Sequence, residues 1–224
     1  MEELGIIDQL LVPVGGYTMT FNLNVIFMTW IVIGLLFFFG YMAARKRSRL
    51  PGPLQVVGEL LVSNLYAVVE DALDKELSRK YAPLICALFM FLVISNWLGI
   101  IPNLSEPTKD LNTTLSLGLM GFFIAHYAGI RAKGIKTYVK GYFEPIFFMM
   151  PLNLIGELSK VVSISFRLFG NIMGGSIIIL VVSYLTWSFI LPPFLNMYFG
   201  LFVGMVQAFV FTMLTLVYIS TQVN

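Results

Sequence analysis

The chain has 224 residues, of which 58% are hydrophobic and only 12% are Asp, Glu, Lys or Arg. Soluble domains carry about 25% charged residues, so this composition excludes an ordinary soluble enzyme or binding domain and indicates an integral membrane protein. The formal net charge is only +2. The positions of the charges are therefore more informative than their sum.

Five apolar segments are long enough to cross a bilayer, because one span needs about 20 residues. Residues 1–24 precede them and are predicted to form an outside N-terminus. The predicted spans are residues 25–44, 82–101, 113–130, 145–187 and 194–221. The last two are longer than a bilayer is thick, so we expect them to tilt.

The segment between the first two spans, residues 53–77, has the pattern of an amphipathic helix on the cytoplasmic membrane surface. Its apolar stripe consists of Leu54, Val57, Leu61, Leu65, Val68 and Val69, and its acidic positions are Glu59, Glu70, Asp71, Asp74 and Glu76. The predicted fold class is therefore an all-α polytopic membrane protein. It has about five membrane-spanning helices and one surface helix, and the last two helices are long and tilted.

Basic residues determine the predicted orientation, because Lys and Arg concentrate on the cytoplasmic side of membrane proteins. With five spans, three basic groups fall on one side: Arg45, Lys46, Arg47 and Arg49; Lys75, Arg79 and Lys80; and Arg131, Lys133, Lys136 and Lys140. Lys109 alone falls on the other side. The N-terminus is then outside and the C-terminus cytoplasmic.

Arg167 is the last charged residue, and it lies inside the fourth predicted span. A guanidinium at the centre of a bilayer costs at least about 2.5–3.5 kcal/mol. Arginine keeps its proton in proteins, so this cost cannot be relieved by neutralisation. We expect Arg167 to face protein or water and to mark an ion or substrate pathway.

Helical spacing places further polar residues around Arg167. Asn171 and Ser163 lie one turn away on the same face, and Lys160 returns to that face further along. Ser176 points to the opposite face, at about 100° per residue. Two polar faces are expected if each lines a different aqueous route. For the Ser and Gly residues of this segment, close helix packing is an alternative explanation.

The last predicted span contains Gly200 and Gly204, a small-xxx-small pair for which we expect close helix packing. Gln207 follows on the same face, where it is a candidate partner for Arg167. The polar residues that continue toward the C-terminus are Thr212, Thr215, Tyr218, Ser220 and Gln222.

Two segments resemble subunit a of the F-type ATP synthases: residues 165–171, Ser-Phe-Arg-Leu-Phe-Gly-Asn, and residues 206–218, which contain Gln207. Residues 107–114 resemble the loop between that family's middle helices. The resemblance implies a membrane stator beside a ring of c subunits, which the last two helices face. The family's essential arginine, asparagine and glutamine fall on Arg167, Asn171 and Gln207.

The same resemblance implies peripheral-stalk b subunits and the rest of the ATP synthase as partners, in the inner membrane of a bacterium. It implies ion transfer to and from c-ring carboxylates through two offset half-channels, with Arg167 essential. The candidates for lining the ion path or orienting Arg167 are Asn171, Gln207, Glu157, Ser176, Lys160, Ser163, Asn153, Thr215 and Tyr218. Whether His126 and Glu144 take part is left open.

This sequence departs from the family where proton-pumping relatives commonly carry Glu, at Ser176, and where some carry His, at Gly200. The coupling ion is accordingly left open between H⁺ and Na⁺. Transient Na⁺ contacts along Ser176 and Glu157 are the one metal interaction considered. We expect no cofactor, no nucleic acid and no ATP chemistry in this chain. A stand-alone channel or secondary transporter and a purely structural anchor remain alternatives.

Overall fold

The computed structural model describes residues 9–14, 17–45, 52–101, 104–143, 150–185 and 191–223. The helices in these ranges are α1 (Leu23–Arg45), α2 (Pro53–Ala72), α3 (Lys75–Leu98), η2 (Pro107–Lys109), α4 (Leu111–Lys133), α5 (Ile135–Phe143), α6 (Met150–Leu185), α7 (Leu191–Met197), η4 (Tyr198–Val203) and α8 (Gly204–Val223). Five of the helical stretches are long and apolar enough to cross a membrane. The predicted helical, polytopic membrane architecture is confirmed.

Two strands that the sequence analysis did not predict precede the helices. Strand β1 (Gln9–Val14) pairs antiparallel with β2 (Tyr17–Asn22). Residues 17–21 are mainly aromatic or β-branched, which favours extended backbone. The hairpin therefore occupies part of the segment that was expected only to lead into the first span.

The predicted surface helix ends earlier than expected. Pro53 occupies its first turn, where the missing N–H costs nothing. Leu73 and Asp74 are extended, and Asp74 is the N-cap residue of α3. Aspartate favours helix N-caps over helix interiors, which accounts for a break within residues 53–77. Helix α3 consequently begins at Lys75, before the predicted span at 82–101.

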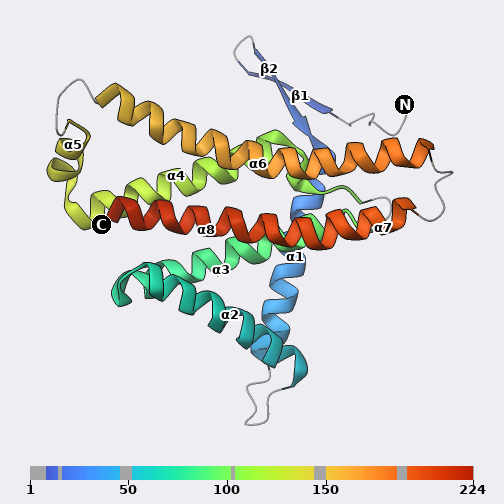
Figure 1. Ribbon diagram of the computed structural model, residues 1–224, viewed down its shortest axis with the longest axis horizontal. Coiled ribbons are helices and arrows are strands. Elements are labelled where there is room, and N and C mark those ends of the chain that lie inside the picture. The colour runs from blue at the N-terminus through green and yellow to red at the C-terminus, as the bar shows by residue number, and fades with distance from the viewer. Residues whose placement is uncertain are drawn as a thin grey trace.

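The two long C-terminal segments lie side by side and antiparallel along the longest dimension of the molecule, while α1 runs across them (Figure 1). Helix α6 has 36 residues, a length of about 54 Å, against a hydrocarbon core about 30 Å thick. The stretch from α7 to α8 has 33 residues and is about 50 Å long. These lengths require strong tilt if both stretches cross a bilayer.

Three glycines of α4 allow neighbouring helices to approach closely. A Cβ at Gly118 would collide with the Ser165 hydroxyl of α6, and one at Gly121 would lie 3.1 Å from Thr215 of α8. A Cβ at Gly129 would lie 2.7 Å from the ring of Tyr138 in α5. Small residues at such crossings are a common packing device between membrane helices. Helix α4 therefore supports the inner sides of α5, α6 and α8.

The last helical stretch contains a π-helix, η4, opposite α3. Asn96 of α3 is fully buried, and its Nδ2 donates to the carbonyl oxygen of Gly204 at 2.8 Å. Its Oδ1 accepts from the Thr108 hydroxyl at 2.7 Å. Any Cβ at Gly200 would lie 2.5 Å from Ile100. The close packing expected for Gly200 and Gly204 is confirmed, and Asn96 bonds to the backbone where η4 ends.

Candidate functional site

Arg167 lies on the outward side of α6. An adjoining side of this helix, with Ile164, Leu168 and Ile172, is buried in a core cluster that also contains residues of α3 and α8. Arg167 itself is exposed, and among the described residues it forms no hydrogen bond or ion pair. Further exposed apolar side chains lie along the two helices: Leu158, Val162, Phe166, Ile177 and Val181 of α6, and Met205, Val206, Phe209 and Val217 of α8.

Asn171 and Gln207 are brought together across the α6–α8 contact. Asn171 Nδ2 donates to Gln207 Oε1 at 2.6 Å. Gln207 is only 4% exposed, and its Nε2 is buried without a hydrogen-bond partner. Neither amide bonds to Arg167, which lies one turn before Asn171 on α6. No hydrogen bond joins Gln207 to Arg167, the partnership considered in the sequence analysis, among the described residues.

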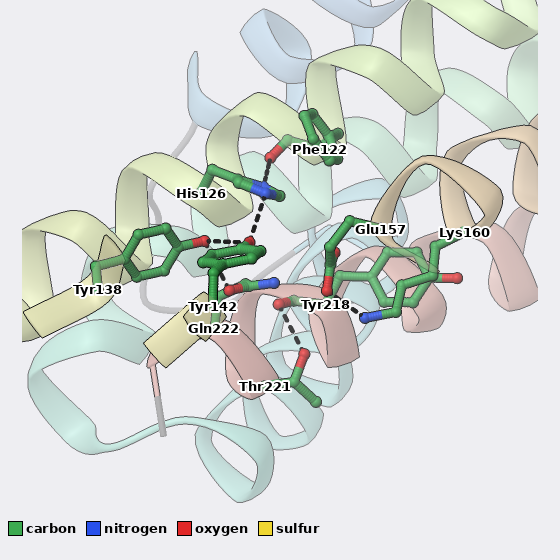
Figure 2. Close-up of polar contacts among 9 residues, drawn as sticks. All are labelled: Phe122, His126, Tyr138, Tyr142, Glu157, Lys160, Tyr218, Thr221 and Gln222. Atoms are coloured by element: carbon green, nitrogen blue, oxygen red, sulfur yellow. Dashed lines mark hydrogen bonds and ion pairs between the residues drawn. The ribbon is translucent and has the colours of Figure 1, made fainter. Parts of the chain in front are cut away.

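A cavity of about 510 Å³ lies where α5 meets the ends of α6 and α8, and we call it the α5 cavity. Glu157 and Lys160 line it and form the expected pair, with Lys160 Nζ 2.6 Å from Glu157 Oε1 (Figure 2). The Lys160 ammonium also lies 5.6 Å from the centre of the Tyr218 ring. Asn153 lines the cavity, and its Nδ2 donates to the Tyr142 carbonyl oxygen at 3.1 Å.

A chain of hydrogen bonds joins α4, α5 and α8 beside this cavity (Figure 2). His126 Nδ1 lies 2.9 Å from the carbonyl oxygen of Phe122, which can only accept, so Nδ1 carries a proton. Nε2 is 3.1 Å from the hydroxyl of Tyr142, which lies 3.1 Å from that of Tyr138. The Tyr138 hydroxyl donates to Gln222 at 2.7 Å. His126 is thus hydrogen-bonded at both ring nitrogens.

Burial and the Tyr142 hydrogen bond raise the pKa of Tyr138, so its hydroxyl stays protonated. This protonated hydroxyl remains available as a donor to Gln222. Glu144, the other residue left open by the sequence analysis, lies outside the described residues.

A second cavity, of about 470 Å³, lies at the other end of α6, and we call it the loop cavity. Ser176 and Asn196 line it together with Glu106 and Lys109 of the loop before α4. The Ser176 hydroxyl donates to the Ile172 carbonyl of its own helix at 3.1 Å. Burial raises the pKa of Glu106, while a backbone hydrogen bond and the charge of Lys109 oppose this shift.

Glu106 and Asn196 were missed by the sequence analysis. Glu106 lies in a loop, and Asn196 is a single polar residue near the start of the predicted span 194–221, so no repeating pattern marks either residue. Only the packing of η2 against α6 brings the loop to Ser176. The one sequence signal for Glu106 is that it is an acidic residue in the loop expected to join two spans.

The remaining candidate residues lie apart from these groups or form hydrogen bonds within their own helix. Ser163 is exposed on α6. Thr215 is buried, donates to the Phe211 carbonyl at 2.9 Å and packs on Gly121, so it faces α4 instead of a cavity. In the described ranges, no three His, Cys, Asp or Glu side chains gather as a metal site would require.

Comparison with known proteins identifies one family over most of the chain. The ATP synthase A chain family matches residues 26–220. ATP synthase subunit a of Moorella thermoacetica is 38% identical over 88% of each chain, and that of Helicobacter pylori strain P12 is 39% identical over 84% of each. ATP synthase subunit a 2 of a Bradyrhizobium strain is 33% identical over 100% of this chain and 98% of its own. With matches of this extent, the chain belongs to the ATP synthase A chain family.

Proposed function

We propose that the chain is the ion-translocating stator of an F-type ATP synthase. It passes ions between the two sides of the membrane and carboxylates on a rotating c ring. The observation that carries the proposal is the presence of two polar cavities at opposite ends of α6, one beside Lys160 and one beside Ser176. Arg167 lies between them, about 10 Å from Lys160 and about 14 Å from Ser176 along the helix axis.

In this proposal the α5 cavity is the cytoplasmic half-channel and the loop cavity is the outside one. The basic residues of the α4–α5 region support this sidedness, because Lys133 itself lines the α5 cavity. The N-terminus then lies outside and the C-terminus in the cytoplasm of a bacterium. Neither cavity crosses the membrane alone, so an ion must board the c ring to continue.

The exposed apolar side chains of α6 and α8, together with the exposed Arg167, fit the c ring as the partner of these two helices. A cation with no hydrogen-bonding partner among the described residues needs water or an opposite charge from another chain. A c-ring carboxylate that has lost its ion supplies this charge, and at about 4 Å the attraction is worth roughly 4 kcal/mol before desolvation at an effective dielectric near 20. The same positive charge repels cations that would leak directly between the cavities. A transporter that acts alone would not require such a surface for docking a partner. The peripheral b subunits are proposed as further partners from family membership.

Rotation follows from the membrane potential. Each elementary charge that crosses gains about 2.3 kcal/mol per 100 mV. Because the two cavities open on opposite sides, an ion that enters by one and leaves by the other must turn the ring. Glu157 and Lys160 line the cytoplasmic route, Ser176 lines the outer route, and the chemistry of ATP belongs to other subunits.

Alanine at Asn171 or Gln207 is expected to slow transport without preventing assembly. Each substitution leaves the other amide without its hydrogen-bond partner at 2.6 Å. In Asn171→Ala, both polar atoms of the buried Gln207 side chain then lack a hydrogen bond, at a cost of about 1–3 kcal/mol. We expect ATP-driven transport in liposomes to fall roughly three- to tenfold, equivalent to about 0.6–1.4 kcal/mol of barrier. Thr212→Ala, on α8 but bonded within its own helix, is the matched control. Unchanged transport in both variants would remove these residues from the site.

The coupling ion is tested by varying H⁺ and Na⁺ separately. Ser176 offers a hydroxyl where proton-pumping relatives commonly carry a carboxylate, which favours Na⁺, whereas water in the cavities favours H⁺. ATP hydrolysis by the intact complex is measured at alkaline pH, where protons are scarce. Stimulation by millimolar Na⁺ is the expected result for a sodium route. Hydrolysis indifferent to Na⁺, with uncoupler-sensitive acidification of liposomes, is the expected result for protons.

A further inference from the structure

The outer route contains a carboxyl group that does not come from α6. Helix α6 and the stretch from α7 to α8 carry no acidic residue beyond Arg167. Glu106 nevertheless lines the same cavity as Ser176, because η2 packs against α6. From the loop it therefore supplies the functional group that the long helices lack at this end.

The structure leaves a specific place for this carboxyl group. Gly99, at the end of α3, also lines the loop cavity, and a Cβ at that position would overlap the Glu106 carboxyl. Gly99 has φ −71°, which any residue adopts, so its lack of a side chain matters for space and not for backbone conformation. The Glu106 side chain thus occupies a space that only glycine leaves open.

The charge balance of the cavity also depends on Glu106. Lys109 lines the same cavity, and a fixed ammonium group there opposes the entry of any cation. The Glu106 carboxylate lies within the electrostatic range of Lys109 and offsets its charge. Glu106 is the only acidic side chain described along this cavity.

We propose that Glu106 is the ion-exchanging carboxyl of the outer half-channel, held over Gly99 beside Ser176. It takes the coupling ion from water in the loop cavity and releases the same ion toward the c ring, so its own charge is restored in each cycle. For protons, the carboxylate gains and then loses one proton. For sodium, its oxygens replace and then return part of the ion's water shell. This inference rests on the function proposed above.

The first test replaces Glu106 by glutamine, which keeps the shape but neither titrates nor carries charge. A positioned acid or base contributes about 10²–10⁴-fold, and water partly substitutes in an open cavity, so we expect transport by the intact complex in liposomes to fall on the order of tenfold. Ser176→Glu in this background places a carboxyl back in the same cavity and should restore most of the loss. Ser116→Glu, at an exposed serine of α4, is the control for an added carboxyl elsewhere.

A second measurement does not depend on the behaviour of Ser176→Glu. Gly99→Ala displaces the Glu106 carboxyl and should reduce transport as Glu106→Gln does. In a Glu106→Ala background, Gly99→Ala should add little, because no carboxyl remains to be displaced. Normal transport in Glu106→Gln, or additive losses from Gly99→Ala and Glu106→Ala, would overturn the proposal. If these results occur while Arg167→Gln still abolishes transport, the proposed function stands and only the role of Glu106 is lost.

Discussion

Replacing Arg167 by alanine, glutamine or lysine is expected to abolish coupled ATP synthesis and ATP-driven ion transport. The lost attraction of roughly 4 kcal/mol corresponds to about a thousandfold in rate. Lysine retains a charge but loses the planar guanidinium, and unlike arginine it can give up its proton when desolvated. The measurement is ion transport by the purified complex in liposomes, with the amount of assembled complex determined in parallel.

Two controls separate this effect from damage to the complex. Hydrolysis by the detached catalytic head should be unchanged, because the chain performs no ATP chemistry. Arg131→Gln removes the same charge from an exposed position at the end of α4 and should leave coupling intact. Full coupling in Arg167→Ala would exclude the proposed mechanism and would leave a structural anchor as the better interpretation.

Asn96→Ala is expected to destabilise the chain strongly. The substitution removes the buried acceptor for the Thr108 hydroxyl and the donor to the Gly204 carbonyl. A buried polar group left unsatisfied costs about 1–3 kcal/mol, so the loss for the two contacts is about 2–5 kcal/mol. We expect less of the chain in assembled complexes and a lower midpoint of thermal unfolding of the purified complex.

The control for this prediction is Asn112→Ala, at an exposed asparagine in the first turn of α4. A double-mutant cycle with Thr108→Val isolates the Asn96–Thr108 contact, since the second substitution should cost less once the first is made. Wild-type stability in Asn96→Ala would mean that the π-helix does not need this support.

The spans and the position of Arg167 could be predicted because each follows from the bilayer itself. The length of an apolar segment shows whether it can cross the bilayer, and an arginine inside such a segment costs free energy that a functional role explains. The Glu157–Lys160 pair follows from helical spacing alone and is present. These features need no knowledge of which helices are neighbours.

Most of the features that were missed depend on tertiary contacts. Helix α5 has only nine residues, and its tyrosines have partners on α4 and α8. Directly after the π-helix η4, the carbonyl oxygen of Gly204 accepts a hydrogen bond from Asn96, which is far away in the sequence. Glu106 lines the same cavity as Ser176 because η2 packs against α6. The hairpin before α1 consists of short strands that no helical pattern reveals.

The π-helix η4 also affects how this chain tolerates changes in length. A π-turn closes its hydrogen bond over one residue more than an α-turn, so it holds one additional residue at nearly the same axial height. Loss of a single residue within Tyr198–Val203 would convert this turn to ordinary α-helix. Because only the additional residue is lost, Gln207 and α7 would both keep nearly their present orientations. Loss of one residue at this point should therefore leave both the α6–α8 contact and the loop cavity, where Asn196 lies, intact, whereas loss of one residue from a purely α-helical turn would rotate the helix on one side by about 100°.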